Sequence, residues 1–193
     1  TIDVFHDNTT PVDINLFHLD LSDKLMSPDN LFEDFDPRLL PNFDLNIDKL
    51  SFNQDDLGNL SFEFRSDEEK VAFKRIGGEL LSLKMKSSDI HPSDFFWFYD
   101  GSVHRSKFTG LISIGKIEEF FDVFEVSPPL DSESGELLFS VDWDDKPWEI
   151  RKDNAMGELQ IDLYKGSFYN SSTGANTALK LVSLFNFANW LKR

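Results

Sequence analysis

The spacing of hydrophobic and polar residues predicts a protein built mainly from β-strands. Apolar and polar residues alternate strictly over residues 60–65, 81–86 and 159–163. A period of two puts the apolar side chains on one face of a strand and the polar ones on the other. Strands of this kind are typical of an antiparallel sheet with one covered face. Further strands are expected at residues 43–47, 71–75, 108–114 and 137–143.

Turn-forming residues separate these segments. The turns are predicted at residues 56–59, Gly77-Gly78, Asp100-Gly101, Ser134-Gly135 and Lys165-Gly166.

Two segments have the period of an amphipathic helix. In residues 116–126, Ile117, Phe120, Phe121 and Phe124 recur at helical spacing, and Pro128-Pro129 then stops the helix. The second helix is expected from about residue 174 to the end of the chain. The fold class is therefore a β-rich α+β protein, with a twisted, curved antiparallel sheet, one apolar face and two short helices.

Charge divides the chain unevenly and limits its partners. The net charge is −16, and residues 1–69 hold 17 Asp and Glu against 4 Lys and Arg, a balance of −13. With three prolines between residues 28 and 41, residues 1–42 are expected to be an acidic, partly irregular portion beside a β-rich domain at 43–193. No basic stripe is present, which argues against nucleic acid and against a polybasic membrane dock.

Composition supports a packed apolar interior. Hydrophobic residues make up 40% of the 193 residues, and 20 of them are Phe. Aromatic residues favour strands and bring a large apolar surface that must be covered. Cysteine is absent, so the chain has no disulfide or thiolate site. No apolar run approaches the roughly 20 residues that a membrane helix needs.

No motif for catalysis or metal binding stands out, so we expect no enzyme, no cofactor and no metal site. The sequence has no nucleophile elbow, phosphate loop or zinc helix motif. His6, His18, His91 and His104 are scattered, which disfavours a histidine metal site. Residues 131–136 superficially match a calcium loop, but Gly135 is the fifth residue and not the sixth. We interpret this run as a solvated turn.

The apolar strand faces leave two interpretations open. The strands and helices could simply bury one another, which the pattern alone favours slightly. Alternatively, the sheet has more apolar surface than two short helices can cover, and the remainder forms a groove for an apolar ligand. The candidate lining is the apolar set of the alternating strands: Leu60, Phe62, Phe64, Leu81, Leu83, Met85, Leu159, Ile161 and Leu163.

The order of short motifs resembles a known family. Residues 36–41 read Asp-Pro-Arg-Leu-Leu-Pro, residues 97–101 read Trp-Phe-Tyr-Asp-Gly, and residues 108–111 read Phe-Thr-Gly-Leu. They are followed by Pro147-Trp148, a Gly157-Glu158-Leu159 strand leading to Lys165-Gly166-Ser167-Phe168, and a closing Leu184-Phe185-Asn186-Phe187. From about residue 36 onward this succession resembles the C-terminal region of YhdP-like proteins of the AsmA-like group. It departs from their pattern at Asp144-Asp145-Lys146.

The resemblance implies a function that the residues alone do not. Such proteins are implicated in carrying phospholipid between the inner and outer bacterial membranes and in outer-membrane integrity. They look like long curved sheets that cross the periplasm from one inner-membrane anchor. By this resemblance the chain would be a periplasmic piece of an envelope protein, whose partners are an acyl-chain ligand and the rest of the full-length chain. Membrane contact would occur only outside this piece. The alternative is a non-catalytic structural or protein-interaction module whose helices close the sheet.

Overall fold

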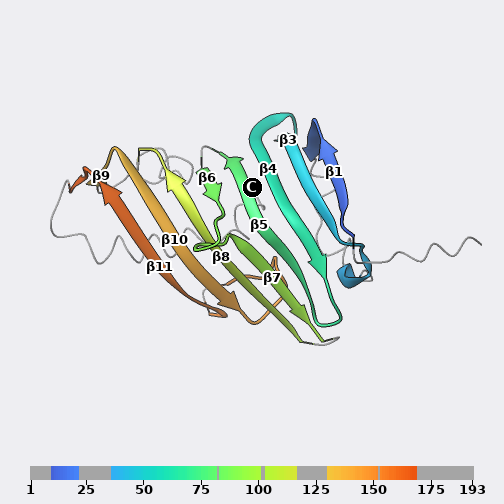
Figure 1. The fold of residues 1–193 in the computed structure, drawn as a ribbon. Coiled ribbons are helices and arrows are strands. Elements are labelled where there is room, and N and C mark those ends of the chain that lie inside the picture. Colours follow the sequence, from blue (N-terminus) through green and yellow to red (C-terminus); the bar gives the residue numbers. More distant parts are fainter. Residues whose placement is uncertain are drawn as a thin grey trace, which may run out of the picture.

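A single large sheet dominates the protein (Figure 1). The computed structural model describes residues 10–21, 36–81, 83–100, 103–116, 130–151 and 153–168. Ten strands form the sheet in the order β1-β3-β4-β5-β6-β8-β10-β11, with β2 beside β3 and β7 between β5 and β8. Their bounds are β1 Val12–Leu16, β2 Leu19–Leu21, β3 Phe43–Phe52, β4 Asp55–Ser66, β5 Lys70–Leu80, β6 Leu83–Lys86, β7 Asp94–Tyr99, β8 His104–Ile114, β10 Ser134–Trp143 and β11 Ala155–Tyr164. A separate pair joins β9 (Leu130–Asp131) to β12 (Ser167–Phe168).

The β-rich prediction is confirmed, but the sheet is mixed and not purely antiparallel. Strands β3 to β11 pair antiparallel with their neighbours, whereas β1 and β2 both run parallel to β3. The sequence analysis missed these two strands, although Val12–Leu16 alternates apolar and polar residues as strictly as the strands that were predicted. They also place residues 12–21 of the acidic N-terminal portion in the same sheet as the rest of the chain.

Several residues predicted to form turns lie inside strands. Gly58 is within β4 and Gly78 within β5, with φ angles of 117° and 135°. A Cβ atom at either position would collide with a backbone carbonyl of the facing strand. These glycines therefore let two bulged strands approach each other and do not reverse the chain. Ser134 and Gly135 likewise begin β10, while Asp100 and Lys165 do follow strand ends.

Strands β6 and β7 both lie between β5 and β8, one after the other along these two strands. β5 pairs with β7 through residues 70–73 and with β6 through residues 78–80. The connection between β6 and β7 is fixed by Ser93, which is fully buried. Its Oγ donates to the carbonyl of Lys86 and accepts from the amide of Leu111, while its carbonyl accepts from the amide of Ile76.

Helix is nearly absent from the part of the chain that the structure describes. Its one helical element is the 3-10 turn η1 (Pro37–Leu39). Asp36 caps this turn, and Arg38 links it to the sheet by donating to the carbonyls of Glu68 and Tyr99. The segments expected to form helices, residues 117–126 and 174–193, lie outside the described residues, as do the aromatic positions that motivated them.

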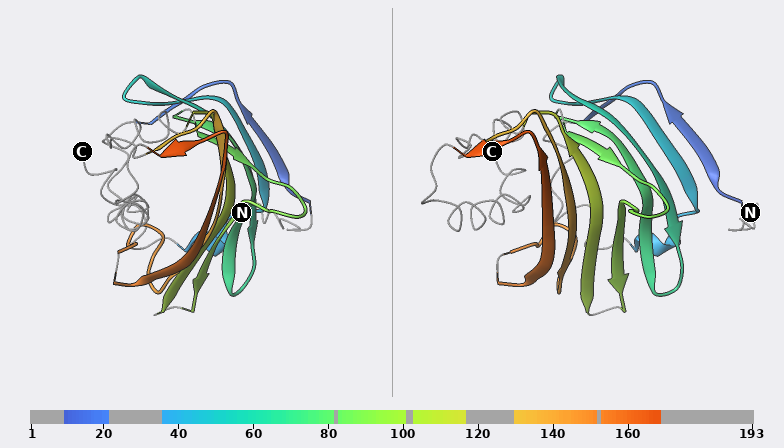
Figure 2. Two further views of the ribbon diagram at one scale, coloured as in Figure 1. Left: turned by 90° about the vertical axis from the view of Figure 1, so that its left-hand side faces the viewer. Right: turned by 60° about the vertical axis from the view of Figure 1, so that its left-hand side comes forward.

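The sheet is curved, which gives it a concave and a convex side (Figure 2). The β6–β7 connection projects from the convex side. The hydroxyl of Thr109 reaches the carbonyl of Pro92 in that connection, at 3.4 Å. Because neighbouring residues of a strand face opposite sides, Phe108 and the residues in register with it face the concave side.

Candidate functional site: the concave apolar face

The concave face is uncharged along the registered strands. Phe43 of β3 lies opposite Phe64, Phe64 opposite Phe73, Phe73 opposite Phe95, and Phe95 opposite Phe108. The strand register places further residues on this face, and none of them is Lys, Arg, Asp or Glu. They are Leu45, Ile47, Leu60, Phe62, Val71, Trp97, Ser106, Gly110, Ile112, Ile114, Gly135, Leu137, Phe139, Val141, Trp143, Ala155, Gly157, Leu159, Ile161 and Leu163.

Six phenylalanine rings form a continuous row across this face. The row runs through Phe43, Phe64, Phe73, Phe95, Phe108 and Phe139, with centroid separations of 4.8, 5.3, 5.9, 5.9 and 4.9 Å. Stacked and edge-on contacts at such distances add to the stabilisation from apolar burial. Since six strands contribute one ring each, the row extends for roughly 24 Å at about 4.8 Å per strand spacing. We call it the phenylalanine row.

Exposure on the concave face varies along the sheet. Phe64 of β4 and Leu137 and Phe139 of β10 expose only 2%, 1% and 4% of their surface. Phe73, Phe95 and Phe108, on the strands between β4 and β10, are half-buried. Gly110 makes room for one ring of the row, because a Cβ there would lie 2.7 Å from the tip of Phe139. The face therefore has two parts packed as tightly as a protein core, around β4 and β10, with a less buried stretch between them.

The structure places most of the predicted lining on this face. Phe62 and Phe64 belong to one apolar cluster, and Leu83, Met85, Leu159, Ile161 and Leu163 belong to or pack against the other. Leu60 lies opposite Ile47 on the same face. Leu81 is the exception, since it occupies the turn after β5 with a φ angle of 52°. Whether these residues bind lipid stays a prediction.

The sequence analysis omitted most of the face. Phe43, Phe73, Phe108 and Phe139 lie in strands that were predicted, and their spacing from neighbouring apolar residues was the signal that could have found them. Strand β7 gave no such signal. Its sequence, Asp-Phe-Phe-Trp-Phe-Tyr, is apolar on both faces, so Phe95 and Trp97 could not be separated from Phe96 and Phe98 by alternation.

A connecting segment bends under one edge of the concave face. Residues 144–151 follow β10, and we call them the lip. The Ser106 hydroxyl donates to the carbonyl of Asp145, and the Trp143 indole donates to the carbonyl of Lys146. Trp148 packs edge-on against Trp97, with centroids 5.7 Å apart. These contacts hold the lip against the aromatic end of β7.

Titratable groups gather at the lip and beside it. The Trp97 indole donates to Nδ1 of His104 at 3.0 Å, which requires a neutral imidazole with its proton on Nε2. Burial and the nearby Lys146 charge lower the pKa of His104. A hydrogen bond with Asp145 raises the pKa of Glu149. Burial opposes ionisation of Asp145, but bonds from Glu149, the Lys146 amide and Arg151 outweigh it and lower its pKa.

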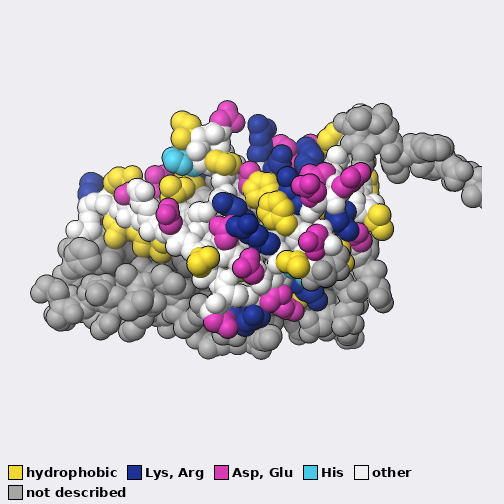
Figure 3. Space-filling model, turned by 90° about the horizontal axis from the view of Figure 1, so that it is seen from below, with side chains coloured by type: hydrophobic (Ala, Val, Ile, Leu, Met, Phe, Trp, Pro, Cys, Tyr) yellow, Lys and Arg dark blue, Asp and Glu magenta, His cyan; other side chains and the backbone are white. Residues whose placement is uncertain are grey.

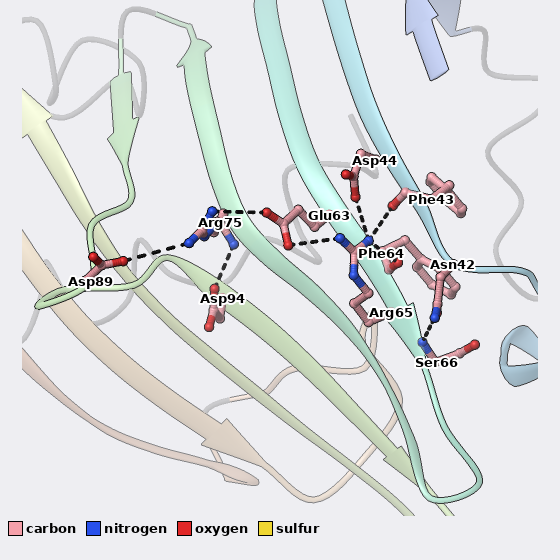
Figure 4. A network of polar contacts seen from close by, with 10 residues as sticks. All are labelled: Asn42, Phe43, Asp44, Glu63, Phe64, Arg65, Ser66, Arg75, Asp89 and Asp94. Atoms are coloured by element: carbon pink, nitrogen blue, oxygen red, sulfur yellow. Dashed lines mark hydrogen bonds and ion pairs between the residues drawn. The ribbon is translucent and has the colours of Figure 1, made fainter. Parts of the chain in front are cut away.

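The convex face is polar and closely ion-paired. Acidic and basic side chains are interspersed over this side, at the top of Figure 3. Figure 4 shows its central network, in which Arg65 contacts Asp44 at 2.6 Å and Glu63 at 3.1 Å. Arg65 also donates to the carbonyls of Phe43 and Phe64. Arg75 joins Glu63 to Asp89. The two faces of the same strands therefore have opposite chemistry.

The described residues contain no group of three or more His, Asp or Glu side chains placed to hold a metal ion. A search of the same residues for a helix of the length and hydropathy needed to span a bilayer also finds none.

This architecture defines a class: a large curved sheet with an uncharged concave face and a charged convex face. The sequence model of the YhdP family, described as "YhdP protein", matches residues 1–193. The chain therefore belongs to the YhdP family, and the match includes residues 1–35, which the motif resemblance did not cover. No curated protein and no solved structure matches the chain. Family membership supports, at the level of the family, a role in the cell envelope and in lipid transport.

Proposed function

We propose that this chain is a segment of a periplasm-spanning, AsmA-like envelope protein that carries phospholipid between the inner and outer membranes. In this proposal the acyl chains lie along the phenylalanine row. The observation that carries it is the uncharged concave face, which crosses the sheet from β3 to β11 without a Lys, Arg, Asp or Glu in register. The protein acts by binding and not by catalysis.

The dimensions of the row support this proposal. Its length of roughly 24 Å exceeds the depth that the chains of one lipid fill, which is about half of the 30 Å hydrocarbon core of a bilayer. The chains could therefore lie across the strands while the polar headgroup stays at the edge of the sheet. Apolar contact alone would hold them, which agrees with the absence of a basic stripe on this acidic chain.

One observation favours a second function, a structural or protein-interaction module with a closed sheet. Two residues of the face are almost fully buried, with 2% exposure at Phe64 and 1% at Leu137. A lipid would then have access only to the half-buried residues, such as Phe73 and Phe95 in the middle of the sheet and Leu159 and Ile161 of β11. The two functions differ in whether any acyl chain occupies the concave side.

Native mass spectrometry of gently purified protein tests the proposal. We expect the parent protein to carry phospholipid that is released by organic solvent. Ile161→Glu would place a charge on the concave face of β11 and should lower lipid occupancy by about tenfold or more. Gln160→Glu, the matched control, changes the adjacent exposed position on the other face. Circular dichroism must show that both variants keep the strand content of the parent.

A parent protein that carries no lipid, and takes up none from phospholipid vesicles, would favour the closed module. The same conclusion would follow if Gln160→Glu lowered occupancy as much as Ile161→Glu.

A further inference from the structure

Lys146 is an unusual cation among the described residues, because it is half-buried and forms no ion pair with a described carboxylate. Among the described lysines, Lys49, Lys70, Lys86, Lys107 and Lys165 each lie within 4.0 Å of an acidic side chain. Lys74, Lys84, Lys116 and Lys146 have no such ion pair in the described chain. The first three are exposed to solvent, and only Lys146 is half-buried.

The surroundings of Lys146 explain why it stays unpaired. Its ammonium lies 5.7 Å from the centre of the Trp148 ring. The nearby Asp145 carboxylate accepts from the Lys146 amide and forms an ion pair with Arg151 at 3.3 Å. Asp145 and Glu149 also share a hydrogen bond with each other. The Asp145 and Glu149 carboxylates are thus committed to other partners, and the positive charge of Lys146 is left over the aromatic ring.

The position of this charge relates it to the concave face. The carbonyl of Lys146 accepts from Trp143, whose ring lies 5.9 Å from that of Phe95 in the phenylalanine row. Trp148 contacts Trp97 on the same face. At the lip, the uncharged concave face therefore ends at Trp148 and Lys146. Indole rings and lysine ammonium groups with apolar stems are also found where a bilayer changes from hydrocarbon to headgroup.

We propose that Lys146 and Trp148 form a site for the anionic phosphate of a lipid headgroup, with the ammonium as the counter-charge and the indole at the junction with the acyl chains. This inference rests on the proposed function, because it assigns the polar end of the same ligand. The lip then sets one orientation for the lipid, with the headgroup beside β7 and β10 and the chains directed over the phenylalanine row. Arg151 remains paired with Asp145 and Asp153 and does not take part.

The test compares two ligands that differ only in the phosphate. Phosphatidic acid and diacylglycerol with identical acyl chains are offered to the 193-residue protein in neutral detergent micelles, and occupancy is measured by native mass spectrometry. We expect the parent to prefer phosphatidic acid by about tenfold, the change that a charge-assisted contact supplies. Lys146→Gln should abolish the preference while still binding diacylglycerol. Lys84→Gln, the matched control, removes an exposed unpaired lysine and should keep it.

The outcomes separate this inference from the proposed function. If both lipids bind but Lys146→Gln keeps the preference, or Lys84→Gln loses it equally, the headgroup site is wrong and the groove stands. If the parent binds neither lipid, the proposed function fails and the headgroup assignment fails with it. The last measurement uses inorganic phosphate as the ligand. If it raises the melting temperature of the parent but not of Lys146→Gln, and neither lipid binds, the site takes free anions and the lipid assignment is overturned.

Discussion

The concave and convex faces of this sheet are made by the same strands but are held together by different forces. On the concave face, aromatic and aliphatic side chains are in contact from strand to strand, and two clusters around β4 and β10 are almost fully buried. On the convex face, ion pairs such as Arg65–Asp44 connect neighbouring strands in partial contact with water. Because a screened surface ion pair contributes little and a buried side chain contributes about 1.5–3 kcal/mol, the concave face supplies most of the stability.

The comparison also shows what a ligand must do. An acyl chain bound on the concave side, as proposed, would compete with the packing that stabilises the fold, whereas a partner on the convex side would meet charged side chains interspersed with apolar ones such as Phe96 and Leu138. In the proposed function, lipid binding and stability would therefore depend on the same surface. Substitutions that affect one face and spare the other can separate the two contributions.

The largest effect is expected from a charge in the most buried part of the concave face. Leu137 is 1% exposed, and Leu137→Asp would bury an unpaired carboxylate, so we expect a loss of about 4 kcal/mol or more and a domain that is mostly unfolded. Leu138→Asp, on the convex face one residue away, should cost about 1 kcal/mol. Urea denaturation followed by tryptophan fluorescence measures both. Equal losses would contradict the distinction between the faces.

A smaller loss is expected from adding one methyl group beneath the phenylalanine row. Gly110→Ala would bring a Cβ to 2.7 Å from the Phe139 ring tip, so the ring must shift. We expect a cost of about 1–3 kcal/mol from this overpacking. At Gly77 the nearest side-chain atom to a new Cβ is Ser61 Oγ at 3.3 Å, so Gly77→Ala serves as the control and should cost less. Thermal unfolding of the two variants in parallel gives the difference.

On the convex face, the effect depends on how far each arginine is buried. The Arg65 side chain is 26% exposed and that of Arg75 is 68% exposed. Arg65→Gln removes charge-assisted bonds to Asp44 and Glu63 and should cost about 1–2 kcal/mol, whereas Arg75→Gln should change stability by less than about 0.5 kcal/mol. Chemical denaturation at low and at high salt tests this ranking. A larger loss for Arg75→Gln would show that the exposed end of the network matters more.

The smallest effect is a pH dependence from the edge of the concave face. Because the pKa of His104 is lowered in the folded protein, the unfolded chain binds its proton more tightly. The stability from neutral His104 is complete above the ordinary histidine pKa of about 6.5 and is lost as pH falls through the lower folded value. We expect this slope in the parent and its reduction in His104→Gln. Melting curves between pH 7.5 and pH 5 on both proteins measure it, and identical slopes would exclude His104 as the cause.

The strands could be predicted from sequence where one face is apolar and the other polar. Leu60, Phe62 and Phe64 alternate with Ser61, Glu63 and Arg65, and this segment lies in β4 as predicted. The prediction failed where alternation is lost. β7 has aromatic residues on both faces, and the three residues of β2 are too few to show a period. β1 does alternate, as Val-Asp-Ile-Asn-Leu, and was overlooked. The parallel pairing of β1 and β2 with β3 depends on contacts between distant parts of the chain, which no local pattern contains.

Glycine was the main source of error in placing the turns. Gly58 and Gly78 have positive φ angles, and a positive φ occurs both in turns and in bulged strands. The difference is set by the facing strand, which the sequence does not identify. Most candidate lining residues share one face because they alternate within single strands, and their role in binding lipid stays a prediction. The lip could not be predicted from sequence, because the positions of Lys146 and Trp148 at the edge of the concave face depend on contacts with Trp143 and Trp97.

The nearly sequential order of the strands has a consequence for how the sheet assembles. From β3 to β11 the strands of the sheet pair with neighbours in sequence, apart from the shared place of β6 and β7 and from the pair β8–β10, which β9 separates in the chain. Each antiparallel pair closes a comparatively short loop, so the loss of chain entropy is incurred in small steps as one hairpin adds to the next. β1 must instead find β3 in parallel register, with Val12 opposite Phe43. We therefore expect the meander to form first and β1 to join last, with its amides exchanging hydrogen fastest among the strands.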